Sequence, residues 1–147
     1  MPNYDTNLRP GVAGAQADMT PSTVISRNVE VAEIGFGKVV QQGTRDRGCT
    51  NVLTNMDAST YLGITMRDRS VAAGNDLLKQ NDSARIMTKG TIWVEVGSAV
   101  DAGDAVTVTL ATGVIDNTAV GAGIVAIPNA RFETSTTGAG LAVVRLG

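Results

Sequence analysis

Apolar and polar residues alternate with a period of two over most of the chain from Val24 onward, a pattern typical of half-buried β-strands. The clearest example is the stretch 105–110, in which valine and leucine alternate with alanine and threonine. No window has the 3.6-residue period of an amphipathic helix. The other expected strands cover residues 29–34, 35–40, 61–66, 123–127, 131–134 and 141–146, with a short one near Val52-Leu53. Short strands separated by glycine-rich turns predict an all-β fold: a small sandwich or barrel-like domain of short antiparallel strands.

The runs 86–88 and 91–96 are both rich in β-forming residues and flank Gly90. Two such runs around a glycine predict a β-hairpin. In the second run the three aliphatic residues share one face, and Trp93 shares the other with Glu95.

Three further boundaries follow from glycine, asparagine and proline. The segment 35–40 is expected to be one strand with two glycines, which often mark a bulge. The segment 70–83 is expected to be a loop. The strand at 123–127 is expected to end near Pro128, because proline lacks a backbone donor.

Residues 1–22 differ from the rest of the chain. Three of the four prolines lie here, together with the small-residue stretch 11–17, and no apolar period is sustained. Proline disfavours regular pairing. The composition predicts an extended N-terminal arm over 1–22, followed by a single β domain over 23–147. The arm is either a frayed end or a segment that orders on a partner, and the residues expected to make that contact are Tyr4, Leu8 and Arg9.

The chemistry available to the chain is narrow. Its 147 residues contain no histidine and one cysteine, Cys49. The commonest general base and the commonest metal ligand are therefore missing. We expect no catalytic residues, no metal site and no cofactor. Asp101 and Asp104 flank a turn glycine, and turn chemistry explains them better than a catalytic pair.

Charge and hydropathy limit the expected partners. The net charge is −2, without a basic stripe, so nucleic acid is not expected to bind. No apolar run approaches about 20 residues, so no membrane span is expected. No secretory signal is apparent, and the single cysteine fits assembly in a reducing cytoplasm.

Surface arginines and the single tryptophan are the remaining candidates for partner contact. The triplet Arg-Asp-Arg occurs twice, and its guanidinium groups are either solvated or paired with carboxylates of a partner chain. Trp93 is a core residue, an interface residue or a platform for a sugar ring. The candidate partner-binding residues of this group are Arg45, Arg47, Arg67, Arg69 and Trp93.

Several motifs, taken in order, resemble the capsid cement or decoration proteins of tailed bacteriophages. The resemblance spans about residues 30 to 147 and rests on the segments 35–37, 61–64, 67–69, 88–94, 102–106, 130–135 and 140–146. It implies a β-rich, non-catalytic domain that binds the outer surface of the major capsid protein shell, usually as an oligomer. The implied location is the outside of the virion capsid.

Two other functions and the oligomeric state are open at this stage. Trp93 and Glu95 on one strand face are compatible with a carbohydrate-binding β-sandwich, an adhesion module on the virion. A Ser-Lys hydrolase comes third, without a distinct nucleophile. A core of small residues, and shells with threefold and twofold axes, favour a homotrimer, with a dimer second.

Overall fold

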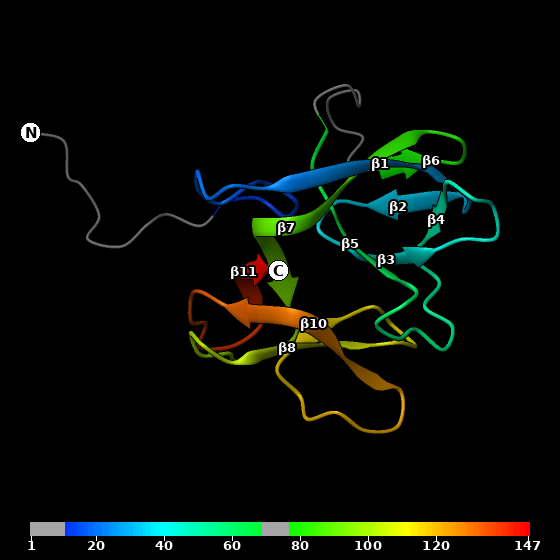
Figure 1. Cartoon of the computed structure of the whole chain (residues 1–147). Helices are drawn as coiled ribbons and strands as arrows, with labels where there is room; N and C mark the ends of the chain where they lie inside the picture. The colour runs from blue at the N-terminus through cyan, green and yellow to red at the C-terminus, as the bar shows by residue number, and fades with distance from the viewer. Residues whose placement is uncertain (1–10, 69–76) are drawn as a thin grey trace, which may run out of the picture.

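The computed structural model describes residues 11–68 and 77–147, and these residues form strands, turns and loops without any helix. The prediction of an all-β fold is confirmed. The strands are β1 (Thr23–Val29), β2 (Glu33–Gly35), β3 (Val39–Gln42), β4 (Gly48–Thr50), β5 (Tyr61–Thr65), β6 (Leu77–Lys79), β7 (Ser83–Val96), β8 (Ala105–Thr109), β9 (Ile115–Asp116), β10 (Ile124–Phe132) and β11 (Gly140–Leu146) (Figure 1).

The strand pairings close two circuits that share β7. The first runs β1-β4-β3-β5-β7 and returns to β1, and the second runs β7-β11-β10-β8-β9 and returns to β7. The second circuit is closed by a single pairing, Val96 with Ile115. The architecture is therefore barrel-like, and β2 and β6 form a separate two-stranded sheet beside it. Most pairings are antiparallel as predicted, but β1–β4 and β7–β9 are parallel.

The expected hairpin at Gly90 is wrong, because residues 83–96 form one continuous strand. The first half of β7 pairs with β1 and β5, and the second half pairs with β11. In Figure 1 the green ribbon of β7 passes from the upper group of strands to the lower one. Gly90 has φ +125°, so it supplies a bend within the strand instead of a turn.

Other boundaries also differ from the pattern. Residues 35–40 are not one strand, because the chain turns at Gly37 (φ +71°) between β2 and β3. The short strand expected near Val52-Leu53 is β4 instead, a few residues earlier. β10 continues through Pro128 to Phe132, because its register shifts between Ala126 and Arg131 and the proline falls in that irregular stretch. The expected loop at 70–83 contains β6; residues 69–76 lie outside the described part of the chain.

Two clusters of buried aliphatic residues fill the interior. The larger contains Ile92, Val94 and Val96, which share one face of β7, together with Phe132 from β10. The smaller cluster contains residues of β1, β2 and β6 and includes Cys49. β7 contributes to both, so burial of its side chains joins the two halves of the domain.

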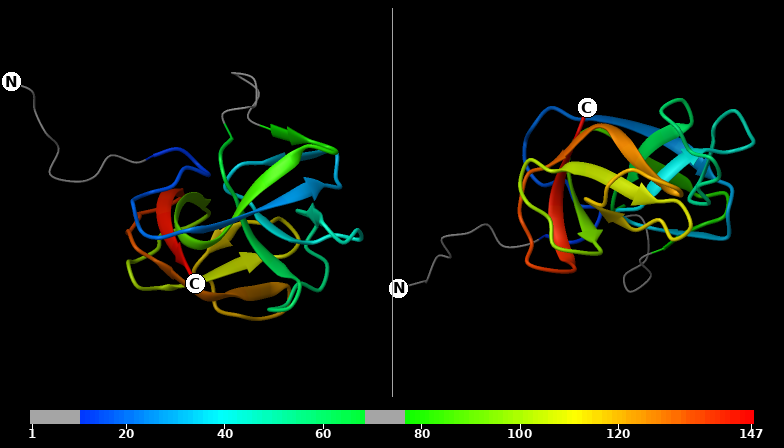
Figure 2. Two further views of the ribbon diagram at one scale, coloured as in Figure 1. Left: turned by 45° about the horizontal axis from the view of Figure 1, so that its top comes forward. Right: turned by 90° about the horizontal axis from the view of Figure 1, so that it is seen from below.

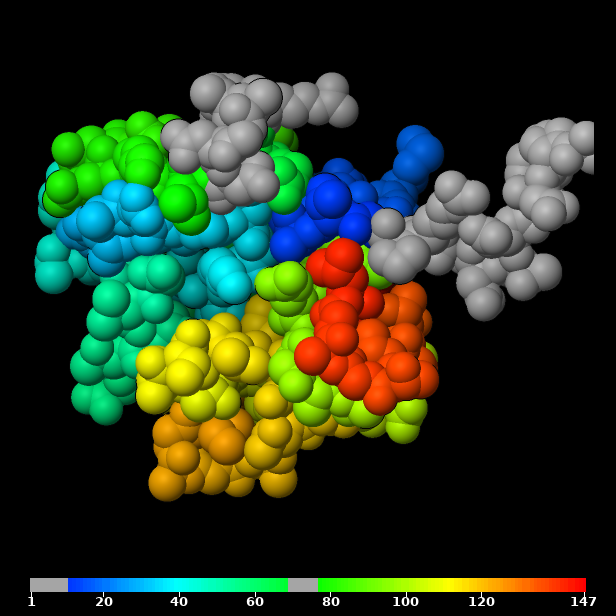
Figure 3. Space-filling view, turned by 180° about the vertical axis from the view of Figure 1, so that it is seen from behind, coloured from blue at the N-terminus to red at the C-terminus, as the bar shows by residue number. Residues whose placement is uncertain are grey.

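The described residues that precede β1 cover the free edge of the second half of β7. The Gly14 amide donates to the Trp93 carbonyl (2.8 Å) and the Trp93 amide donates to the Ala15 carbonyl (2.9 Å). The Ala17 amide donates to the carbonyl of Thr91 (3.2 Å). Both the left view of Figure 2 and the view from behind in Figure 3 show this blue segment beside the red C-terminal strand. Covering an edge in this way satisfies backbone groups that otherwise offer a template for pairing with other chains.

Candidate functional site

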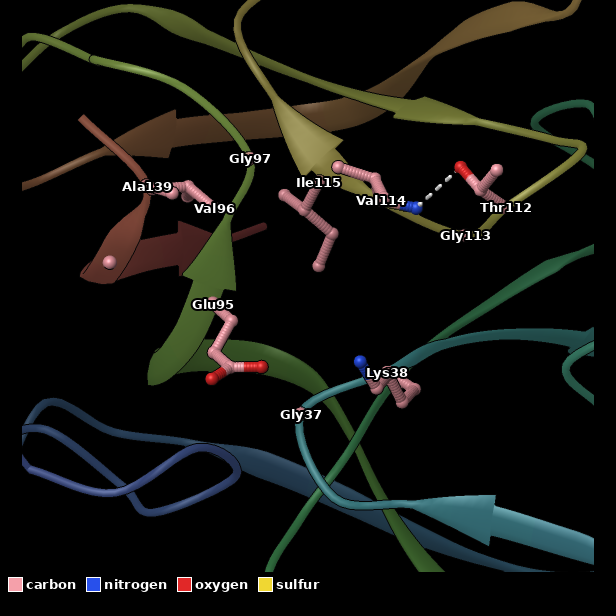
Figure 4. Close-up of a pocket in the computed structure, with 11 residues that line it drawn as sticks. Gly37, Lys38, Glu95, Val96, Gly97, Thr112, Gly113, Val114, Ile115 and Ala139 are labelled. Atoms are coloured by element: carbon pink, nitrogen blue, oxygen red, sulfur yellow. Dashed lines mark hydrogen bonds between the residues drawn. The ribbon is translucent and has the colours of Figure 1, made fainter.

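A hollow on the described surface lies between the two halves of the domain. Its volume is about 380 Å³, and Val96, Val114 and Ile115 form its apolar part. In Figure 4 the side chains of Lys38 and Glu95 extend toward one another from opposite sides of it. The hollow combines aliphatic side chains with one cation and one anion, a mixture also typical of protein contact surfaces.

The described residues hold no constellation for catalysis or metal binding. No group of three or more Cys, Asp or Glu side chains comes together within 11–68 and 77–147. Burial, reinforced by the charge of Glu30, raises the pKa of the Cys49 thiol to about 11, so the thiolate that a nucleophile requires is disfavoured. Asp104 accepts a hydrogen bond from the Asp101 amide (2.9 Å), which is the expected turn chemistry. No helix in this part of the chain is long and apolar enough to cross a membrane.

Trp93 is enclosed by its own chain. Its exposed fraction is 6%. A Cβ on Gly11 would lie 2.6 Å from the indole ring, so the backbone at residue 11 lies directly on it. A sugar ring stacks on an exposed aromatic face, which Trp93 does not present while residues 11–17 are in place. The observation that motivated the carbohydrate-binding alternative is therefore removed.

Arg45 belongs to a loop that is tied to Glu30. The Glu30 carboxylate accepts hydrogen bonds from Thr44 Oγ1 (2.7 Å), the Thr44 amide (2.8 Å) and the Arg45 amide (3.1 Å). Arg45 Nε lies 3.3 Å from Glu30 Oε1. The hydrogen bond from the Thr44 side chain is the main cause that holds the pKa of Glu30 below its usual value. Glu30 thus fixes the loop and neutralises Arg45.

Arg47 lies on the same loop but has a different environment. It lines a second hollow of about 260 Å³ together with Ser26, Arg27, Asn28 and Ser83. Its carbonyl accepts from the Asn28 amide (2.8 Å), which joins the loop to β1. No carboxylate of the described residues forms an ion pair with Arg47 or Arg27. This hollow therefore carries two positive charges without a local counterion.

Arg67 lies near the N-terminal segment. Its guanidinium carbon is 5.0 Å from the centre of the Phe36 ring, a cation–π distance. Its amide donates to the Gly14 carbonyl (2.8 Å). The structure thus places Arg67 and Trp93 around the same segment, and Arg45 and Arg47 on a separate loop. Tyr4, Leu8, Arg9 and Arg69, the other predicted contact residues, lie outside the described residues.

Sequence reasoning missed Arg27, which lines the second hollow, and the contact of Glu30 with the loop at Thr44 and Arg45. Arg27 occurs alone in a strand, and no triplet marks it. Its charge on the half-buried strand 23–29 was the one available signal, because a buried charge requires a partner.

Comparison with known proteins gives a consistent result. The family model described as structural cement protein (E217 gp24/Pam3 gp6) matches residues 1–147. A chain of the capsid of Myoviridae phage XM1 has a similar structure, with a TM-score of 0.76 and 18% identity, over 97% of this chain and 93% of that chain. At that identity the likeness shows the fold. No curated protein sequence matches. Since the family model covers the whole chain, the chain belongs to the family of phage structural cement proteins.

Proposed function

We propose that this cement protein binds the outer surface of the shell built by the major capsid protein, and that it does so as a homotrimer. Membership of the family makes the chain a non-enzymatic structural component of the virion capsid that stabilises the head. Such a role implies contact with the major capsid protein. The full-length family match is the observation that carries the proposal.

The described surface supports a role in contact with other proteins. Several large aliphatic side chains are exposed, among them Met19 (98%), Val120 (65%) and Val52 (59%). Singly exposed aliphatic residues are common on any protein. The described surface also has a hollow with an apolar wall and a hollow with two arginines, and this mixture of apolar and charged groups is typical of protein interfaces.

The direct test is binding to shells of the cognate phage that lack this protein. Purified full-length protein is mixed with such shells, the shells are pelleted, and the bound fraction is measured against concentration. We expect saturable binding and a higher temperature of shell disruption. Shells that pellet without the protein, at concentrations well above that of the shell sites, would refute the proposal.

The trimer rests on symmetry. Shells offer local threefold and twofold axes, and a ligand with matching symmetry gains avidity without new contacts per subunit. Light scattering measures the oligomeric state of the free protein, and counting the copies at each shell site measures the oligomeric state on the shell. A dimer is the second expectation, and a monomer in both measurements contradicts the proposal.

We also propose that the arm, residues 1–22, contacts a neighbouring subunit through the residues before Gly11, with Tyr4, Leu8 and Arg9 as contacts. Residues 14–17 pair with β7, so two truncations separate the roles. Removing residues 2–10 should leave the melting temperature unchanged and weaken shell binding. Removing residues 2–20 should also lower the melting temperature, because Trp93 loses its cover. Unchanged shell binding by the shorter truncation would show that residues 2–10 have no such role.

A further inference from the structure

The hollow formed by β1, the loop before β4 and the start of β7 is lined by two arginines and by no acidic residue. It lies where these elements meet, on the right in Figure 1, and its lining residues are Ser26, Arg27, Asn28, Arg47 and Ser83. Every lining side chain is polar, and two are guanidinium groups. Its volume of about 260 Å³ is large enough for a carboxylate side chain with accompanying water.

Arg27 has an unmet hydrogen-bonding requirement. It lies on β1 opposite Ala84 and is half-buried. One guanidinium nitrogen, Nη1, donates to the Ser26 carbonyl (3.0 Å), whereas Nε is buried without an acceptor among the described residues. A buried donor without an acceptor is costly, and native proteins rarely keep one without a ligand, an ion or water.

Arg47 is held next to this group by the backbone. Asn28 pairs with Gly48 in the parallel β1–β4 ladder, and the Asn28 amide donates to the Arg47 carbonyl. Gln42 Nε2 donates to the carbonyls of Arg45 (2.7 Å) and Asp46 (3.2 Å), which fixes the loop from its other side. The loop is therefore ordered before any partner arrives, which reduces the entropy lost on binding.

Two acids near the hollow have partners of their own, and the carboxylate of Asp46, which precedes Arg47 on the loop, forms no ion pair with either arginine. Glu30 is bound by Thr44 and Arg45. Asp82, next to Ser83, accepts a hydrogen bond from the Lys79 amide (2.8 Å). Arg27 and Arg47 thus remain without a counterion in the described part of the chain.

We propose that this hollow receives an Asp or Glu side chain of the major capsid protein, with Arg27 and Arg47 as the residues that bind its carboxylate. The inference rests on the proposed function and adds the chemistry of one contact. Guanidinium groups bind carboxylates through paired N–H···O bonds, and such charge-assisted bonds are among the strongest in protein interfaces. Asn28 Oδ1 already faces Arg45 (3.5 Å), which leaves the Asn28 side-chain NH₂ as a further donor.

The test compares full-length variants in the shell-pelleting assay. Arg47→Gln removes one charge from an exposed side chain and should leave the fold intact, which a thermal melt checks. We expect its affinity for cognate shells to fall by about tenfold or more, the effect of losing a charge-assisted contact. Arg47→Lys should restore only part of the affinity, because an ammonium group lacks the planar fork. Raising the salt concentration should reduce the difference between Arg47→Gln and the unchanged protein.

Arg145→Gln is the matched control, because it makes the same charge change on β11, where Arg145 Nε pairs with Glu133 (3.2 Å). We expect this variant to bind shells like the unchanged protein. If Arg47→Gln and Arg145→Gln behave alike, the hollow has no special role and the inference is wrong, while the cement function stands. If the unchanged protein does not bind shells at all, the proposed function itself fails. If Arg47→Gln binds shells normally but is less retained on heparin, the hollow binds polyanions and the inference is overturned.

Discussion

Gly63 lies in close contact with β7, at the junction of the two buried clusters. A Cβ added there would lie 2.3 Å from the Met87 carbonyl oxygen and 2.8 Å from Ile86 Cγ2. Met87 belongs to the larger cluster and Ile86 to the smaller, so this contact joins both cores. The nearest atom is backbone and has no rotamer with which to move away. Replacing Gly63 with alanine therefore tests whether close packing at this junction stabilises the domain.

The expected cost follows from the overlap. An ordinary contact between carbon and a carbonyl oxygen is about 3.3–3.6 Å, so the strands must separate by roughly 1 Å. Overpacking of this kind costs about 1–3 kcal/mol. The reduced freedom of the unfolded chain offsets about 0.4–1 kcal/mol. A net loss of about 1–2 kcal/mol lowers the melting temperature of a protein of this size by about 2–8 °C.

The assay is a thermal melt of Gly63→Ala beside Gly138→Ala. Gly138 has no atom within 4 Å of an added Cβ and no positive φ, so it reports the unfolded-state effect alone. We expect Gly138→Ala to melt at or slightly above the temperature of the unchanged protein. A melting temperature of Gly63→Ala equal to that of Gly138→Ala would refute the claim that β5 and β7 are in close contact at this position.

Three further predictions concern acid stability, the thiol and the core. Hydrogen bonds in the folded state lower the pKa values of four carboxyl groups, those of Asp18, Glu30, Asp57 and Asp104. Their contribution to stability is fully present above the ordinary pKa values of 3.8 (Asp) and 4.5 (Glu), and it is lost as the pH falls through the lowered pKa values. The urea concentration at the midpoint of unfolding should therefore decrease when the pH is lowered below about 4. Midpoints that rise on acidification in that range contradict this assignment. Cys49 should react with a thiol reagent at pH 8 only after unfolding, because it is fully buried and its pKa is raised to about 11; rapid labelling of the folded protein contradicts its burial. Phe132→Ala should cost about 3–5 kcal/mol in denaturant unfolding, because Phe132 is among the largest fully buried side chains; a loss below about 1 kcal/mol would mean that the site is not close-packed.

Local sequence patterns were sufficient to predict the class of fold and part of the core. The period of two is a property of the strand backbone itself, so it predicted strands and placed Ile92, Val94 and Val96 on one face, which the structure buries. Turn chemistry is equally local, and it placed the turn at Asp101 and Asp104 correctly. The absence of histidine limited the chemistry without reference to any structure.

Tertiary structure decided which strands pair and which side chains meet. Lys89-Gly90 has the composition of a hairpin turn, yet β7 bends there and continues as one strand, because β1 and β11 offer partners to its two halves. Trp93 is buried because the backbone at Gly11, more than 80 positions earlier, lies on its ring. Neither fact is encoded near the residue concerned, since strand pairing depends on the whole sheet.

The two arginines of the first Arg-Asp-Arg triplet show most clearly what the sequence determines and what the tertiary structure decides. The sequence by itself marked Arg45 and Arg47 as equivalent charged loop residues. The fold brings Glu30 to Arg45 and leaves Arg47 beside Arg27, twenty positions away along the chain. The charge of each residue is a local property, whereas its counterion is supplied by whatever segment the sheet places next to it. The sequence therefore determined that charge would lie on this loop, and only the tertiary structure decided which charge remains available to a partner.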